Sequence, residues 1–143
     1  DIVNHFLNKK VLIVDDSSTA RKQISDTLKQ LGITIIERKN GAQALALLKQ
    51  WADEGKNPCD EILLMFTDAE MPEMDGYRLT AEVRSDPRMS KLFIALNTSL
   101  SGSFNDAMVE KVGCDRFISK FQPDMLVDVA QQRMREYLSE QKQ

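Results

Sequence analysis

The feature that most restricts the fold of this sequence is the placement of charged residues where short apolar runs end. The runs read VLIVDD, EILLMFTD and RFISK, and they end at Asp15 and Asp16, at Asp68 and at Lys120. Short runs of this kind are typical of strands buried on both faces. In open α/β sheets, ligands bind at the carboxyl ends of the strands. Three carboxylates and one ammonium at that edge predict a site that holds a divalent cation and handles phosphate.

Strand-like and helix-like segments alternate from one end of the chain to the other. The segments with a strand pattern are Val11–Asp15, Ile33–Arg38, Ile62–Thr67, Phe93–Asn97 and Arg116–Ser119. Five segments have a helical pattern. The first is capped by Ser17 and ended by Gly32, and the second is capped by Asn40. The others are Tyr77–Ser85, Phe104–Val112, which Gly113 closes, and a last helix that Pro123 opens. Five βα units in a row predict a parallel sheet with helices on both faces. We therefore expect a flavodoxin-like (βα)5 fold of the α/β class, with strand order 2-1-3-4-5.

Composition and charge exclude several classes of protein. The chain has 143 residues, of which 42% are apolar and 29% charged, as expected of one globular domain. A net charge of −3 with mixed signs argues against nucleic-acid binding. No apolar run is long enough for a membrane span, and the polar start DIVNHFLNKK is not a secretory signal. We expect a cytoplasmic protein and, because the first residue is Asp rather than Met, a piece of a longer one.

The cysteine and histidine content excludes other kinds of site. The chain has two cysteines, Cys59 and Cys114, and one histidine. A structural zinc site needs about four such ligands, and a disulfide scaffold needs more cysteines in a shorter chain. We expect two reduced thiols.

The predicted strand order brings the charged residues into one crevice. Asp15 and Asp16 follow the first strand, Asp68 ends the third, Thr98 the fourth and Lys120 the fifth. Carboxylates this close repel one another, and a hard cation such as Mg²⁺ resolves the conflict. Lys120 and Thr98 could then contact phosphoryl oxygens. The simpler alternative is that Asp15 or Asp16 only caps the following helix.

Two other functions fit parts of the pattern. A flavodoxin-like cofactor binder would use the segment Ser17–Thr19 as a phosphate loop, but such loops carry glycines, and two adjacent carboxylates would repel the phosphate. A phosphatase could use Asp68 or Asp15 as its nucleophile. The second aspartate usual two residues after such a nucleophile is absent at both positions.

Three segments together resemble the receiver domain of response regulators. They are VLIVDDS, DAEMPEMDG (Asp68 to Gly76) and the strand-end Lys120, and the resemblance extends from Lys10 to about Leu138. It implies that Asp68 takes a phosphoryl group from a histidine kinase. It also implies that Mg²⁺ is held by Asp15, Asp16, Asp68 and the backbone carbonyl of Glu70.

The same resemblance implies how phosphorylation would be transmitted. Lys120 and Thr98 would contact the phosphoryl group, and Phe117 would be the aromatic switch residue that moves with Thr98. The partner-binding face would include the region Phe104–Val112, the fifth strand and the last helix. The domain would not be an enzyme in the ordinary sense, although it would catalyse its own phosphorylation and dephosphorylation. A phosphate sink, or a docking module that does not switch, remains the alternative.

The turn after Asp68 is expected to shape the site without reacting. Gly76 would supply backbone freedom, Pro72 rigidity, and the side chains of Met71 and Met74 would fill the underside of the loop.

The sequence departs from the receiver pattern in three places. Phe121, not proline, follows Lys120, so we expect a trans bond between them, because a cis bond before a non-proline residue costs about 2.5–4 kcal/mol. The stretch before Asp68 is longer than usual, and the extra residues would lie in a surface loop over Glu54–Asp60. At the positions that tune hydrolysis the chain has Glu70 and Leu100. An apolar Leu100 cannot hydrogen-bond an attacking water, which favours slow dephosphorylation.

Segment similarity is strongest to the C-terminal receiver of CheV-type chemotaxis coupling proteins. The segments are EMPEMDGYRLTAEVRSDP, LNTSLSGSFN and KFQPD. This resemblance implies a CheA-like kinase as phosphodonor and a CheW-like domain before the receiver. We expect residues 1–9 to be a linker or remnant of that domain, residues 10–140 the receiver and residues 141–143 a tail.

Overall fold

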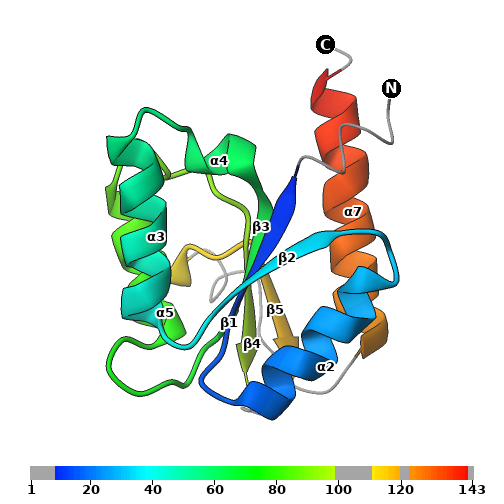
Figure 1. The fold of residues 1–143 in the computed structure, drawn as a ribbon. Coiled ribbons are helices and arrows are strands. Elements are labelled where there is room, and N and C mark those ends of the chain that lie inside the picture. Colours follow the sequence, from blue (N-terminus) through cyan, green and yellow to red (C-terminus); the bar gives the residue numbers. More distant parts are fainter. Residues whose placement is uncertain (1–8, 99–110, 120–122, 142–143) are drawn as a thin grey trace.

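The fold is a single five-stranded parallel sheet between two layers of helices (Figure 1). The computed structural model describes residues 9–98, 111–119 and 123–141. The strands are β1 (Lys10–Val14), β2 (Thr34–Arg38), β3 (Ile62–Asp68), β4 (Ile94–Thr98) and β5 (Arg116–Ser119). Their order across the sheet is β2-β1-β3-β4-β5. The predicted fold class and strand order are both confirmed.

Helices cover both faces of the sheet. They are α2 (Ser18–Lys29), α3 (Gly41–Asp53), α4 (Pro58–Glu61), α5 (Gly76–Ser85) and α7 (Pro123–Gln141). Figure 1 shows α3 and α5 on one side of the sheet and α2 and α7 on the other. In the described part of the chain, no helix is both long and apolar enough to cross a membrane.

Alternation along the strands divides the core into two parts. In β1, Leu12 and Val14 belong to the cluster under α3 and α5, whereas Val11 and Ile13 belong to the cluster under α2 and α7. All seven residues of β3 are buried. This central strand, buried on both faces, carries Asp68 at its end.

The predicted helix caps are confirmed. The Ser17 hydroxyl accepts a hydrogen bond from the Ala20 N–H at 3.2 Å, and the Asn40 side chain accepts one from the Gln43 N–H at 2.9 Å. Gly32 follows α2 with a φ of 78°, the left-handed conformation that glycine adopts at little cost.

Two predicted segments differ from the structure or are only partly described. The expected surface loop over Glu54–Asp60 contains a short helix, because Pro58 opens α4 and the Asn57 side chain caps it at the Cys59 N–H. Most of the predicted helix Phe104–Val112 lies outside the described residues. Its last two positions, 111 and 112, are helical, and Gly113 follows with a φ of 89°.

Both cysteines are free thiols, as predicted. Burial, followed by the charge of Asp115, raises the pKa of the Cys114 thiol to about 11. The side chain is therefore neutral at pH 7 and packs as part of the α3/α5 core.

Arg84 joins the end of α5 to the beginnings of β4 and β5. Its guanidinium donates to the carbonyls of Gly113 (2.7 Å), Ser90 (2.8 Å) and Leu92 (2.6 Å), and it pairs with Asp115 at 3.0 Å. Asp115 Oδ2 also accepts a hydrogen bond from the Ile94 N–H, at 2.8 Å. One planar side chain thus satisfies backbone groups that no strand or helix pairs.

We expect Arg84→Met to destabilise the protein by about 2–3 kcal/mol, because carbonyls and a carboxylate lose charge-assisted hydrogen bonds. Urea unfolding measures the change. Arg88→Met is the matched control, since Arg88 pairs with Asp53 and Asp86 but is exposed. Its unfolding midpoint should stay close to that of the unmodified protein. Equal effects of the two substitutions would contradict this role of Arg84.

Candidate functional site

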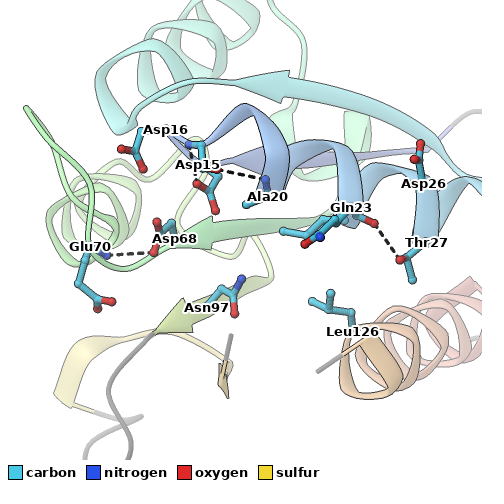
Figure 2. A pocket seen from close by; sticks show the side chains of 12 residues that line it. Asp15, Asp16, Ala20, Gln23, Asp26, Thr27, Asp68, Glu70, Asn97 and Leu126 are labelled. Carbon is cyan, nitrogen blue, oxygen red and sulfur yellow. Dashed lines mark hydrogen bonds between the residues drawn. The ribbon is translucent and has the colours of Figure 1, made fainter. Parts of the chain in front are cut away.

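Three carboxylates meet at the C-terminal edge of the sheet. Asp15 and Asp16 follow β1, and Asp68 ends the neighbouring β3, where Val14 and Thr67 are paired. One carboxylate oxygen from each aspartate lies within 4.8 Å of the others. Asp15 and Asp68 are each 3% exposed, whereas Asp16 is exposed to solvent. Figure 2 shows the three side chains around one end of a cavity. The predicted clustering of these residues is therefore present.

The donor set of this cluster fits Mg²⁺. All three side chains offer carboxylate oxygen, the ligand that Mg²⁺ prefers, and the exposed Asp16 leaves one side open to water and substrate. Three carboxylates this close repel one another strongly where two of them are buried. A divalent cation would convert that repulsion into attraction.

Asp15 is held by the start of α2. Its Oδ1 accepts a hydrogen bond from the Ser17 N–H at 2.9 Å, and its backbone carbonyl accepts one from Arg21 Nη1 at 2.6 Å. Ser17, not an aspartate, caps α2. The carboxylates of Asp15 and Asp16 therefore do not serve as the N-cap of α2. Ser17 uses its hydroxyl in the cap and does not offer it as part of a phosphate loop.

Asp68 is held by the turn that follows it. Its Oδ1 accepts a hydrogen bond from the Glu70 N–H at 3.2 Å. Gly76 packs directly on the Asp68 backbone: a Cβ at this position would collide with the Asp68 carbonyl and would lie 3.0 Å from the Ala69 Cα. The Gly76 N–H also donates to the Ala69 carbonyl at 3.0 Å. Gly76 thus closes the turn onto the end of β3.

The expected reason for Gly76 was wrong. Its φ is not positive, so backbone freedom is not what this position requires; it requires space. The residue of the turn with a positive φ is Glu73, at 67°, and its side chain accepts a hydrogen bond from Asn40 Nδ2 at 3.2 Å. Met71 and Met74 pack against the α3/α5 core, as predicted.

The Glu70 side chain has a role that the sequence did not reveal. Its Oε2 accepts a hydrogen bond from the hydroxyl of Thr98 at 2.9 Å, and Thr98 is completely buried. The Tyr77 hydroxyl on α5 lies close enough to both residues for them to affect its pKa. Burial raises the pKa of Tyr77, Thr98 lowers it, and the Glu70 carboxylate raises it. Glu70 therefore contacts Asp68 through its N–H and Thr98 through its carboxylate.

The predicted switch residues lie on one face of the sheet. Phe117 pairs with Leu96 in the register of β4 and β5 and packs against the α3/α5 core. Thr98 lies two residues beyond Leu96 and so shares its face. Lys120, with the predicted trans bond to Phe121, lies outside the described residues, as does Leu100.

Three residues of the site were not predicted in their observed roles. They are the Glu70 side chain, Tyr77 and Asn97, which lines the cavity beside Asp68. Asn97 gave a signal in the sequence, because it is a polar residue within the apolar strand IALNT. The Glu70 and Tyr77 contacts depend on how the turn after β3 closes, and no pattern in the sequence indicates them.

Comparison with known families identifies one that matches most of the chain. The profile described as the response regulator receiver domain matches residues 11–131. Chemotaxis protein CheV1 of Helicobacter pylori is 36% identical over 125 residues, which are 87% of this chain and 38% of CheV1. Chemotaxis protein CheY1 of the same species is 36% identical over 119 residues, covering 82% of this chain and 90% of CheY1. The chain thus spans well under half of CheV1 but nearly all of CheY1.

Solved structures show the same fold. Chemotaxis protein CheY4 of Vibrio cholerae superposes with a TM-score of 0.71 at 26% identity, covering 87% of this chain and 97% of that one. A putative two-component response regulator with a GGDEF domain gives a TM-score of 0.76 at 25% identity, covering 94% of this chain and 52% of that one.

We expect Gly76→Ala to destabilise the protein by about 1–3 kcal/mol, because the added methyl group must displace the backbone of Asp68. Urea unfolding and the amide NMR shifts of Asp68 and Glu70 measure the effect. Arg78→Ala, at an exposed position of the same helix, is the control and should change neither. Unchanged Asp68 and Glu70 shifts in Gly76→Ala would show that the close approach does not constrain the site.

We expect Glu70→Ala to release the Thr98 hydroxyl, so that the Thr98 side chain samples further rotamers. Methyl NMR of Thr98 reports this as a shift or broadening of its resonance. Glu70→Gln keeps an acceptor oxygen and should largely preserve the resonance. If Glu70→Ala leaves the Thr98 methyl unchanged, the 2.9 Å hydrogen bond does not fix that side chain.

Proposed function

This chain belongs to the response regulator receiver domain family, and we propose that it accepts a phosphoryl group on Asp68 from the phosphohistidine of a histidine kinase. Its similarity to CheV1 and CheY1 makes it a receiver domain related to CheV, of the chemotaxis and two-component signalling type. The observation that carries the proposal is the cluster of Asp15, Asp16 and Asp68 at adjacent strand ends.

The proposed reaction is covalent catalysis by a carboxylate. An Asp68 oxygen attacks the phosphorus atom, the bond from phosphorus to the histidine nitrogen breaks, and that nitrogen keeps the electron pair. The product is an acyl phosphate on Asp68. Bound Mg²⁺, held by Asp15, Asp16, Asp68 and the Glu70 carbonyl, would neutralise charge on the phosphoryl oxygens. The Glu70 N–H keeps the Asp68 carboxylate oriented, since it donates to one of its oxygens.

Lys120 and Thr98 would respond to the negative charge that phosphorylation adds at Asp68. Lys120 is proposed to pair with one phosphoryl oxygen and Thr98 to donate to another. To do so, the Thr98 hydroxyl must leave Glu70, the acceptor that it has in this structure. Phosphorylation therefore sets two acceptors, a carboxylate and a phosphoryl group, in competition for one hydroxyl. Movement of Thr98 would free space on the face where Phe117 packs.

If Thr98 keeps its hydrogen bond to Glu70 after phosphorylation, the receiver would take up phosphate without switching. That is the phosphate-sink alternative, and the 2.9 Å hydrogen bond between Thr98 and Glu70 is the observation that favours it. The two functions differ in where Thr98 lies after phosphorylation. With an apolar Leu100, we propose that the phosphorylated state decays slowly in either case.

The similarity to CheV1 supports proposals about the longer protein. We propose a CheW-like domain before the receiver, with residues 1–9 as a linker or remnant of that domain, the receiver over residues 10–140 and a tail over residues 141–143. A CheA-like kinase is the proposed phosphodonor. The sensor histidine kinase CheAY of Helicobacter pylori, whose match is 44% identical over 89 residues, supports a connection with kinase signalling.

We expect acetyl phosphate with Mg²⁺ to phosphorylate the protein and Asp68→Asn to abolish the reaction. Removing Mg²⁺ with EDTA should slow it by at least about 100-fold, because several kcal/mol of charge stabilisation are lost. A phosphate-affinity gel measures both. Asp60→Asn, at an exposed aspartate of α4, is the control and should react normally.

Phosphorylation that persists in Asp68→Asn, or that is indifferent to EDTA, would contradict the proposed chemistry. The Thr98 methyl resonance, recorded with and without beryllofluoride, then separates the two outputs. A shifted resonance indicates switching, and an unchanged one indicates a phosphate sink.

A further inference from the structure

Arg21, in the first turn of α2, donates to the backbone of the carboxylate cluster. Its Nη1 donates to the Asp15 carbonyl at 2.6 Å, and its Nε forms an ion pair with Glu37 Oε1 of β2 at 3.4 Å. The Arg21 side chain is only 12% exposed. Hydrogen bonds from a guanidinium are charge-assisted, and its planar fork gives them a fixed direction. One side chain thus ties the end of β1 to the edge strand β2.

The Asp15 carbonyl belongs to the peptide bond that carries Asp16. A peptide is planar, so a donor held against its oxygen fixes the orientation of the whole Asp15–Asp16 unit. The other side of Asp15 is held as well, because its N–H donates to the Arg38 carbonyl at 3.2 Å. Asp16 itself is exposed, so packing does little to orient its side chain. The direction of that side chain therefore depends on the backbone that Arg21 holds.

The charge of Arg21 and its hydrogen bond have opposite effects on a metal ion. A guanidinium next to Asp15 repels a divalent cation at the same residue, so its charge alone would weaken metal binding. Its hydrogen bond would strengthen metal binding, because it keeps the Asp16 carboxylate within 4.8 Å of those of Asp15 and Asp68. The sign of the change in Mg²⁺ affinity when Arg21 is removed distinguishes the two effects.

We propose that Arg21 is a positioning residue for the metal site. It holds the Asp15–Asp16 peptide so that the Asp16 carboxylate faces the other two, and Glu37 keeps the guanidinium against the Asp15 carbonyl. Groups that orient metal ligands without touching the metal contribute about 10–100-fold to metal affinity. The inference rests on the proposed function, since it assigns part of the Mg²⁺ binding to a residue outside the ligand set.

Titration with Mg²⁺ alone, followed by amide NMR, tests this role by comparing the unmodified protein with Arg21→Met. Methionine keeps an apolar stem but removes the donors and the charge. We expect Arg21→Met to bind Mg²⁺ about tenfold more weakly. The Asp16 amide resonance should also shift before any Mg²⁺ is added, because its nitrogen shares a peptide bond with the Asp15 carbonyl. Lys22→Met is the control and should change neither, since the Lys22 side chain is 78% exposed and pairs with Asp26.

A second variant separates the lost hydrogen bond from general damage to the fold. Arg21→Ala leaves a space between the Asp15 carbonyl and the Glu37 carboxylate, which free guanidinium can occupy. Guanidinium chloride, far below the concentration that unfolds the protein, should restore most of the Mg²⁺ affinity of this variant, whereas sodium chloride at the same concentration should not. Urea unfolding without Mg²⁺ measures whether each variant is folded during the titration. The two variants are independent, so either one decides the question if the other does not fold.

Unchanged or tighter Mg²⁺ binding in Arg21→Met overturns the proposal, because Arg21 would then act through its charge or not at all. Equal weakening in Lys22→Met also overturns it, as does an Arg21→Ala protein that guanidinium does not rescue. If the unmodified protein binds no Mg²⁺, the proposed function fails, and the Asp16 resonance decides the role of Arg21 separately. A shift in Arg21→Met but not in Lys22→Met then supports the fixed peptide, and the absence of a shift overturns it.

Discussion

Repulsion among three carboxylates is the interaction on which the C-terminal edge of this sheet depends. Parallel pairing of β1 with β3 forces Asp15 and Asp68 together, and both are almost fully buried. The surrounding turns supply backbone donors: the Ser17 N–H donates a hydrogen bond to Asp15, and the Glu70 N–H donates one to Asp68. These two hydrogen bonds orient the carboxylates. Three carboxylate oxygens within 4.8 Å of one another form a donor set that suits a divalent cation.

Glu70 links this charge to the rest of the domain. One residue donates through its backbone to Asp68 and accepts through its side chain from Thr98. A change of charge on Asp68 acts on both contacts, since the N–H is attracted to added negative charge and the carboxylate is repelled by it. The turn that Gly76 closes against β3 keeps the backbone of Glu70 in register for this role.

The sequence predicted the fold and the aspartate cluster because both follow from local patterns. Apolar runs identify strands, and topology places the strand ends together, so Asp15 and Asp68 could be assigned to one crevice without coordinates. The Glu70–Thr98 contact could not be predicted in this way, because it depends on the path of a turn rather than on periodicity. Gly76 was recognised for the wrong reason, since close approach of two backbones leaves no sign in the sequence beyond the glycine itself.

The adjacent residues Asn97 and Thr98 of β4 lie on opposite faces of the sheet, beside the same carboxylate of Asp68. Thr98 lies on the face of α5, where Tyr77 and Phe117 pack, so a movement of Thr98 would act on that layer. Asn97 lines the cavity with Ile24 and Leu126, on the side of α2 and α7. Asn97 pairs with Asp68 and Thr98 follows it in β4, so a change of charge on Asp68 would be felt on both faces of the sheet. Transmission to either helix layer would need no long pathway, because both begin at the end of β3.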